Sequence, residues 1–161
     1  MQHQYSLQTT LMKKILSAII IMMLAGNMTH AQNTLFKKYE NDKRVSTVYI
    51  SKALLSLMPK MKLVDKDISM IAGELDHVQI LTCDHSSLIP GIKSAALSCF
   101  KSEGYETLMT VNDKGEKTII YAKKLPKGKK EFVLFSQEEN ELSIINVAGD
   151  ISLNDIKQIA N

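Results

Sequence analysis

The first 31 residues have the pattern of a secretory signal peptide, and this feature sets how much of the chain can fold as the mature protein. Lys13 and Lys14 precede an apolar run over residues 15–25, and Thr29-His30-Ala31 has the small-x-small form of a cleavage site. Met12 offers an alternative start just before the two lysines. The apolar run is about half of the ~20 residues that span a bilayer, so we expect no membrane anchor. The sequence predicts a leader over residues 1–31 and a mature chain over residues 32–161.

The expected mature chain is almost neutral. Two of the 20 basic residues lie in the leader and none of the 17 acidic ones does, so 18 basic and 17 acidic residues remain, with a formal charge of +1. A general attraction to nucleic acid is therefore not predicted. A lipoprotein would need a cysteine directly after the leader, and the first cysteine of the chain is Cys83. We expect a periplasmic or secreted protein with one exported domain, long enough to bury an ordinary core.

Hydrophobic patterning predicts an α+β domain in the element order β-α-β-α-β-β-β-β-α. Sequential antiparallel strands with helices on one face would form a two-layer sandwich. Residues 32–44 are polar and predict an irregular or short helical segment before the first strand. The expected strands cover residues 45–50, 77–83, 106–111, 117–124, 131–136 and 142–147, and the expected helices cover residues 52–58, 88–103 and a last segment from 152.

The helix boundaries have recognisable signals. Ser51 is a suitable N-cap for the first helix. Pro90 suits the first turn of the second helix, and Gly104 suits the position after its end. Ser152 and Asp155 have capping-box spacing, with Ile151 and Ile156 at the spacing of a hydrophobic staple. Helical spacing also predicts one buried stripe, made of Leu54, Leu57, Met58 and Met61.

Three segments resemble a family of small exported proteins from Gram-negative bacteria, catalogued as domain of unknown function 4252. They run over residues 48–59 (VYISKALLSLMP), 71–81 (IAGELDHVQIL) and 149–156 (GDISLNDI). The resemblance implies an exported α+β domain in an envelope-stress or regulatory setting, and it implies no catalytic residue. Some members resemble lipoproteins, and this chain departs from them because it lacks the lipid-bearing cysteine.

Cys83-Asp84-His85 is the most reactive-looking triplet. Residues two apart on a strand share a face, so a thiolate and an imidazole could meet each other or a metal ion. A structural zinc site needs four ligands, and a Cys–His nucleophile needs an oxyanion donor and an orienting group. The pattern supplies neither set, so a structural cysteine beside an exposed Asp-His pair is favoured. No metal and no cofactor is predicted.

The two cysteines, Cys83 and Cys99, are expected to be free thiols. Cys99 lies about ten residues into the second helix, which carries it ~15 Å along the axis. A disulfide needs Cα atoms within about 7 Å.

Five lysines surround one predicted hairpin turn, and they are the candidate binding residues: Lys123, Lys124, Lys127, Lys129 and Lys130. They could bind phosphate, lipopolysaccharide or another anionic envelope partner. The alternative is a solvated turn whose charges prevent edge aggregation.

Two functions from different classes stay open. The first is a non-enzymatic binding or interaction module of the cell envelope, whose partner is an unknown envelope protein or an anionic surface. The second is a small thiol or metal-dependent hydrolase that uses Cys83 and His85. The chain has no Gly-rich phosphate loop and no Ser nucleophile elbow, so the sequence favours the binding module.

Overall fold

The computed structural model describes residues 31–57, 62–63, 66–67 and 71–160. These residues belong to one compact unit, Ala31–Asn161. The predicted leader lies outside the described residues except for Ala31, which begins a helix, α2 (Ala31–Tyr39). Met58, Pro59, Met61 and Met70 also lie outside them. No helix in the described part of the chain combines the length and the apolar character needed to cross a membrane.

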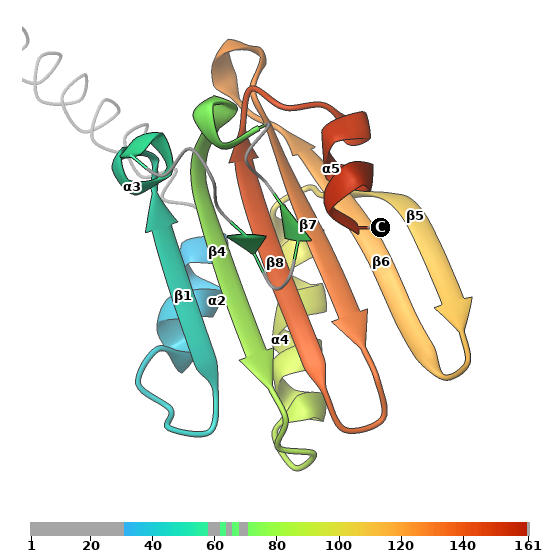
Figure 1. Ribbon diagram of the computed structural model, residues 1–161. Helices are drawn as coiled ribbons and strands as arrows, with labels where there is room; N and C mark the ends of the chain where they lie inside the picture. Colours follow the sequence, from blue (N-terminus) through green and yellow to red (C-terminus); the bar gives the residue numbers. More distant parts are fainter. Residues whose placement is uncertain (1–30, 58–61, 64–65, 68–70, 161) are drawn as a thin grey trace, which may run out of the picture. The chain divides into compact units, whose positions relative to one another are not determined.

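Six antiparallel strands form the main sheet, in the spatial order β1-β4-β8-β7-β6-β5 (Figure 1). The α+β class and the antiparallel sheet predicted from the sequence are therefore confirmed. Strand β1 lies at one edge and β5 at the other. The strands are β1 (Ser46–Ser51), β4 (Leu75–Cys83), β5 (Glu106–Asp113), β6 (Glu116–Lys124), β7 (Lys130–Gln137) and β8 (Leu142–Gly149), with a separate short pair of β2 (Lys62–Leu63) and β3 (Lys66–Asp67).

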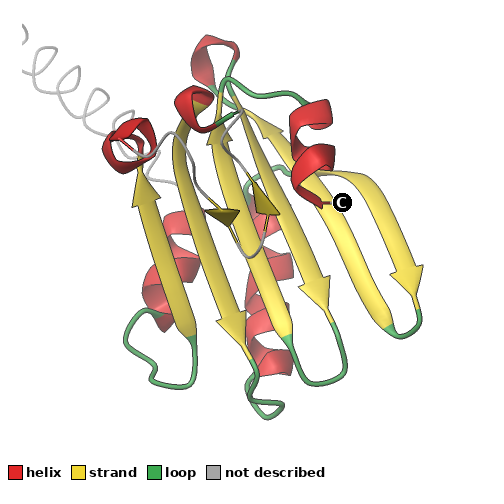
Figure 2. Cartoon of the chain, in the orientation of Figure 1, coloured by secondary structure: helices red, strands yellow, loops and turns green. Residues whose placement is uncertain are grey.

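Helices lie on both faces of the sheet (Figure 2). Helices α2 and α4 (Ile89–Ser102) pack on one face, around Phe36, Ile92 and Phe100. The other face packs against α3 (Lys52–Leu57) and α5 (Leu153–Ala160) through Leu55 and Ile156. We expected all helices on one face. The central strands explain the difference, because β7 is buried at five successive positions and so needs cover on both sides.

The predicted boundaries of α4 and the predicted start of α5 are confirmed to within one residue, whereas the predicted end of the first helix at Met58 lies outside the described residues. Gly104, just past α4, has a φ of +74°, a conformation that glycine adopts readily. The Ser152 backbone N–H donates to Asp155 Oδ2 at 2.7 Å, and the Asp155 N–H donates to Ser152 Oγ at 3.3 Å. Ile151 and Ile156 beside this capping box are both buried. The α5 segment is therefore held at its start by the reciprocal cap and the staple.

The buried stripe predicted for the first helix is wrong at two positions. Leu57 is 77% exposed and Leu54 is also exposed, whereas Leu55 is buried. Helix α3 has only six residues and follows the edge strand β1, so it buries one side chain against the sheet. A 3-10 turn, η1 (Ala72–Glu74), leads into β4.

Candidate functional site

The Lys-rich turn divides into paired and unpaired lysines. Between β6 and β7 the chain makes a 3-10 turn, η2 (Pro126–Gly128). Lys123 forms an ion pair of 2.7 Å with Glu103, and its ammonium lies over the Tyr105 ring at 5.4 Å from the centroid. Lys129 forms an ion pair with Asp76, which also pairs with Lys52 at 3.2 Å. These two lysines therefore hold the turn to its neighbours through ion pairs.

Lys124, Lys127 and Lys130 are exposed and form no salt bridge to any residue that the structure describes. Lys124 and Lys130 are opposite each other in the β6–β7 register, so their side chains project from the same face of the sheet. Lys127 lies in η2, with a φ of +62°. The structure thus brings two of the five candidate residues side by side and leaves the third on the tip of the turn.

Lys124 and Lys130 line a groove with an apolar floor. Its volume is about 560 Å³, within the usual range for small-molecule sites. The apolar lining comes from β5, β6, β7 and α5 and consists of Leu108, Ala122, Phe132 and Leu153. Leu108 lies at an irregularity in the β5–β6 register, which spaces Thr107 and Met109 around it. It is one of the exposed large hydrophobic residues of the domain.

Acidic groups also stand around this groove. Glu103 and Glu106 line it, and Glu103 is neutralised by Lys123. The Ser152 hydroxyl, more than any other group, holds the pKa of the Asp155 carboxyl below its usual value, and the charge of Lys130 adds to this effect. Among the described residues, the Lys124 and Lys130 ammonium groups at the rim form no ion pair, and Lys130 acts on Asp155 only through its charge.

The Cys83-Asp84-His85 triplet lines a different cavity, of about 610 Å³, together with Arg44 and Glu141. The buried Cys83 thiol donates to the backbone carbonyl of His85 at 3.8 Å, whereas His85 Nδ1 lies 2.8 Å from Asp84 Oδ1. No hydrogen bond joins the thiol to the imidazole in the described part of the chain. The geometry therefore does not assemble the Cys–His pair that the hydrolase alternative requires.

Metal ligands and a disulfide are the other uses open to these residues. Within the described ranges, no three His, Cys, Asp or Glu side chains are grouped closely enough to hold a metal ion. Cys83 and Cys99 are both free thiols. Burial is the main cause that raises the pKa of the Cys99 thiol, with Glu103 adding to it. A raised pKa reduces the thiolate fraction at neutral pH and with it the reactivity of Cys99.

A buried polar cluster lies on the α4 face of the sheet. Asn146 Nδ2 donates to Glu131 Oε1 at 2.6 Å, and both residues are buried. Tyr105 also hydrogen bonds to Glu131 and has a pKa raised above its usual value, mainly by burial. Glu131 and Asn146 are enclosed by protein and Tyr105 is half-buried, so we assign this cluster to the stability of the fold.

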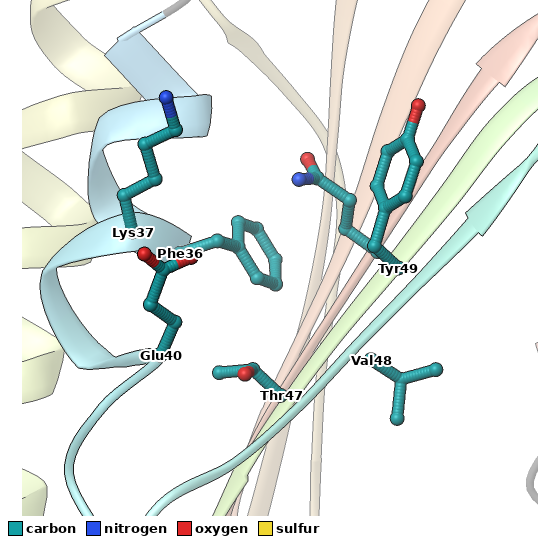
Figure 3. A pocket seen from close by; sticks show the side chains of 7 residues that line it. Phe36, Lys37, Glu40, Thr47, Val48 and Tyr49 are labelled. Atoms are coloured by element: carbon teal, nitrogen blue, oxygen red, sulfur yellow. The ribbon is translucent and has the colours of Figure 1, made fainter.

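A third hollow, of about 270 Å³, separates α2 from the edge strand β1 (Figure 3). Phe36, Lys37 and Glu40 line it from the helix side. Thr47, Val48 and Tyr49 line it from β1, and Gln79 from the neighbouring β4. Tyr49 is 63% exposed, and its ring stacks on His77 at a centroid distance of 6.1 Å.

The lysines of the groove were identified from the sequence but its apolar lining was not, although part of that lining could have been found. Period-two alternation places Lys124 on the face of Ala122, and Lys130 on the face of Phe132. That signal was available in the sequence. The positions of Leu108 and Leu153 depend on the β5 irregularity and on the docking of α5, which no local pattern specifies.

The family model described as Domain of unknown function (DUF4252) matches residues 39–159. No curated protein and no solved structure matches the chain.

Proposed function

The chain belongs to the family of domain of unknown function DUF4252, and we propose that it is an exported, non-enzymatic binding domain of the bacterial cell envelope. The signal-peptide pattern of residues 1–31 supports export to the periplasm or beyond. The separation of the Cys83 thiol from the His85 imidazole argues against the hydrolase alternative. The family resemblance adds a regulatory or envelope-stress setting as the context of binding.

The ligand class we propose is an anionic amphiphile, bound in the groove beside the Lys-rich turn. One observation carries this proposal: Lys124 and Lys130 stand opposite each other at the rim of a groove floored by Ala122 and Phe132. An apolar chain would bury Leu108, Leu153 and the floor, and a carboxylate or phosphate would lie near the two ammonium groups. Among the five predicted lysines, Lys129 is paired with Asp76, and Lys123 lines the groove with its ammonium paired to Glu103.

The experiment compares binding of dodecanoate by the purified wild-type protein and by the double variant Lys124→Gln/Lys130→Gln. Each exposed charge pair contributes at most about 1 kcal/mol to binding. Loss of both pairs should therefore weaken binding about tenfold at low salt. A second variant, Leu108→Asp, places a carboxylate on the apolar floor and should weaken binding at any salt concentration. Vesicles with and without anionic phospholipid form a second arm, which separates a free amphiphile from a membrane surface.

The matched control is Lys101→Gln/Lys117→Gln, which removes the same charge from exposed sites outside the groove. Its affinity should equal that of the wild type. Equal binding by the wild type and the groove variants would reject the proposed site. Binding to anionic vesicles but not to dodecanoate would assign the lysines to a membrane surface.

A further inference from the structure

Within the part of the chain that the structure describes, β1 is an edge strand that lacks the usual protection of an edge. Its sequence, Ser-Thr-Val-Tyr-Ile-Ser, has no charge and no proline, and its pairing with β4 is continuous over all six residues. Natural edges are normally blunted by charges, prolines or bulges, because their free N–H and C=O groups can pair with another strand. The opposite edge, β5, has such protection, with acidic residues at both ends and a register irregularity beside Leu108.

The surroundings of β1 are also apolar and exposed. Val48 is 44% exposed and Tyr49 is 63% exposed, and Leu54 and Leu57 of α3 lie exposed directly after the strand. On the face of the sheet that α2 covers, the hollow between α2 and β1 runs along the strand (Figure 3). The free backbone edge, the apolar side chains and the hollow together form a surface suited to strand addition.

We propose that this surface, the β1 edge, binds a second copy of the chain, so that two six-stranded sheets join into one continuous antiparallel sheet. A two-fold axis normal to the sheet near Val48 would place β1 antiparallel to β1 of the partner copy. Such an isologous contact must be self-complementary. The uncharged strand meets this requirement, because no side chain of β1 opposes a like charge when the strand faces itself.

The charges of α2 indicate a copy of this chain as the occupant. Lys37 and Glu40 both line the hollow beside β1, with Lys37 toward the Tyr49 end and Glu40 toward the Thr47 end (Figure 3). A two-fold axis near Val48 exchanges these two ends. Lys37 of one copy would then lie at the level of Glu40 of the other, so two pairs of opposite charge would flank the joined strands.

The test measures the dimer dissociation constant of the purified protein by sedimentation equilibrium. Val48→Lys places two ammonium groups opposite each other across the axis and should raise that constant by about tenfold or more. The matched control is Val111→Lys on β5, because Val111 is 42% exposed and lies on the other edge strand. This control should dimerise like the wild type.

A charge exchange gives a second readout that does not depend on strand stability. Lys37→Glu and Glu40→Lys should each weaken the dimer, and the double exchange should restore it. A monomeric wild type at high protein concentration would overturn the proposal and leave the edge to a strand of another protein. Equal effects of Val48→Lys and Val111→Lys, or no rescue by the double exchange, would also overturn it.

Discussion

The Asn146 side-chain amide donates a hydrogen bond of 2.6 Å to the Glu131 carboxylate. Both residues are buried, and they belong to two neighbouring central strands of the sheet. Strands β7 and β8 carry the two residues on the face covered by α4. A buried carboxylate requires hydrogen-bond donors, since its transfer from water is otherwise costly. Asn146 and Tyr105 act as donors to it, which makes them part of one polar network.

Asn146→Asp should destabilise the domain in a pH-dependent way. The substitution places two carboxyl groups within hydrogen-bond distance, and such a pair must retain a proton in the folded state. The unfolded chain loses that proton at a pH of about 4, so the free energy of unfolding should fall as the pH rises above this value. At neutral pH we expect a loss of about 3 kcal/mol, measured by denaturant unfolding.

Asn140→Asp is the control for this prediction, because Asn140 is exposed in the turn between β7 and β8. Its unfolding free energy should follow that of the wild type at every pH. A pH-independent loss in Asn146→Asp would show that packing, and not charge, makes Asn146 important.

The sequence predicted the strands well and the pairing of their polar residues poorly. Alternation, capping signals and turn residues are local, so the six strands and the boundaries of α4 and α5 followed from them. No local pattern marks Glu131 as buried, since it directly follows Lys129 and Lys130 in the sequence. Its burial depends on the β6-β7-β8 alignment and on Tyr105, contacts that join residues far apart in the sequence.

The same limit applies to the candidate site. Five lysines in eight positions suggested one cationic patch, yet Lys123 and Lys129 are used by Glu103 and Asp76. Asp76 lies on β4, at the register irregularity between Leu75 and His77, and its contact with Lys129 joins residues 53 positions apart in the sequence. Only the alternation of Lys124 and Lys130 with apolar neighbours could have separated these two lysines from those held in ion pairs.

Gly149→Ala should be among the most destabilising small substitutions in the domain. A Cβ atom at this position would collide with the Glu74 carbonyl oxygen and the Leu75 Cα, which are backbone atoms and cannot move aside easily. The same carbonyl accepts the Asp150 N–H at 2.9 Å. We expect a loss of about 1–3 kcal/mol by thermal or denaturant unfolding.

Gly91→Ala is the matched control for Gly149→Ala. Gly91 lies in the first turn of α4, and an added Cβ would meet no atom within 4 Å. Alanine favours helices over glycine, so this variant should be neutral or gain up to about 1 kcal/mol. Similar losses in the two variants would contradict the close approach of β8 to η1.

Asp76→Asn should lower stability slightly at neutral pH and remove part of the acid sensitivity. The Lys129 ammonium, and then that of Lys52, holds the pKa of the Asp76 carboxyl below its usual value. A lowered folded-state pKa stabilises the fold above the unfolded value of about 3.9, and this contribution is lost as the pH falls through the folded-state pKa. Because the three side chains are partly exposed, we expect at most about 1 kcal/mol, reduced further by salt.

Asp113→Asn on the exposed end of β5 provides the comparison for Asp76→Asn. Thermal unfolding should be measured for both variants from neutral to acid pH. Only Asp76→Asn should be less stable than the wild type, and this difference in stability should become smaller as the pH falls. A stability difference that persists at acid pH, or that salt does not reduce, would rule out the ion pair as its cause.

Both cysteines should be alkylated when the protein is denatured without a reducing agent, adding two labels to the intact mass. The buried Cys83 thiol donates a hydrogen bond to the His85 carbonyl, and burial raises the pKa of the Cys99 thiol. Labelling of the folded protein should therefore be slow. Cys99→Ser should take one label under the same denaturing conditions. No label on the wild type would reveal a disulfide, and rapid labelling of Cys83 in the folded state would revive a role for this thiol in catalysis.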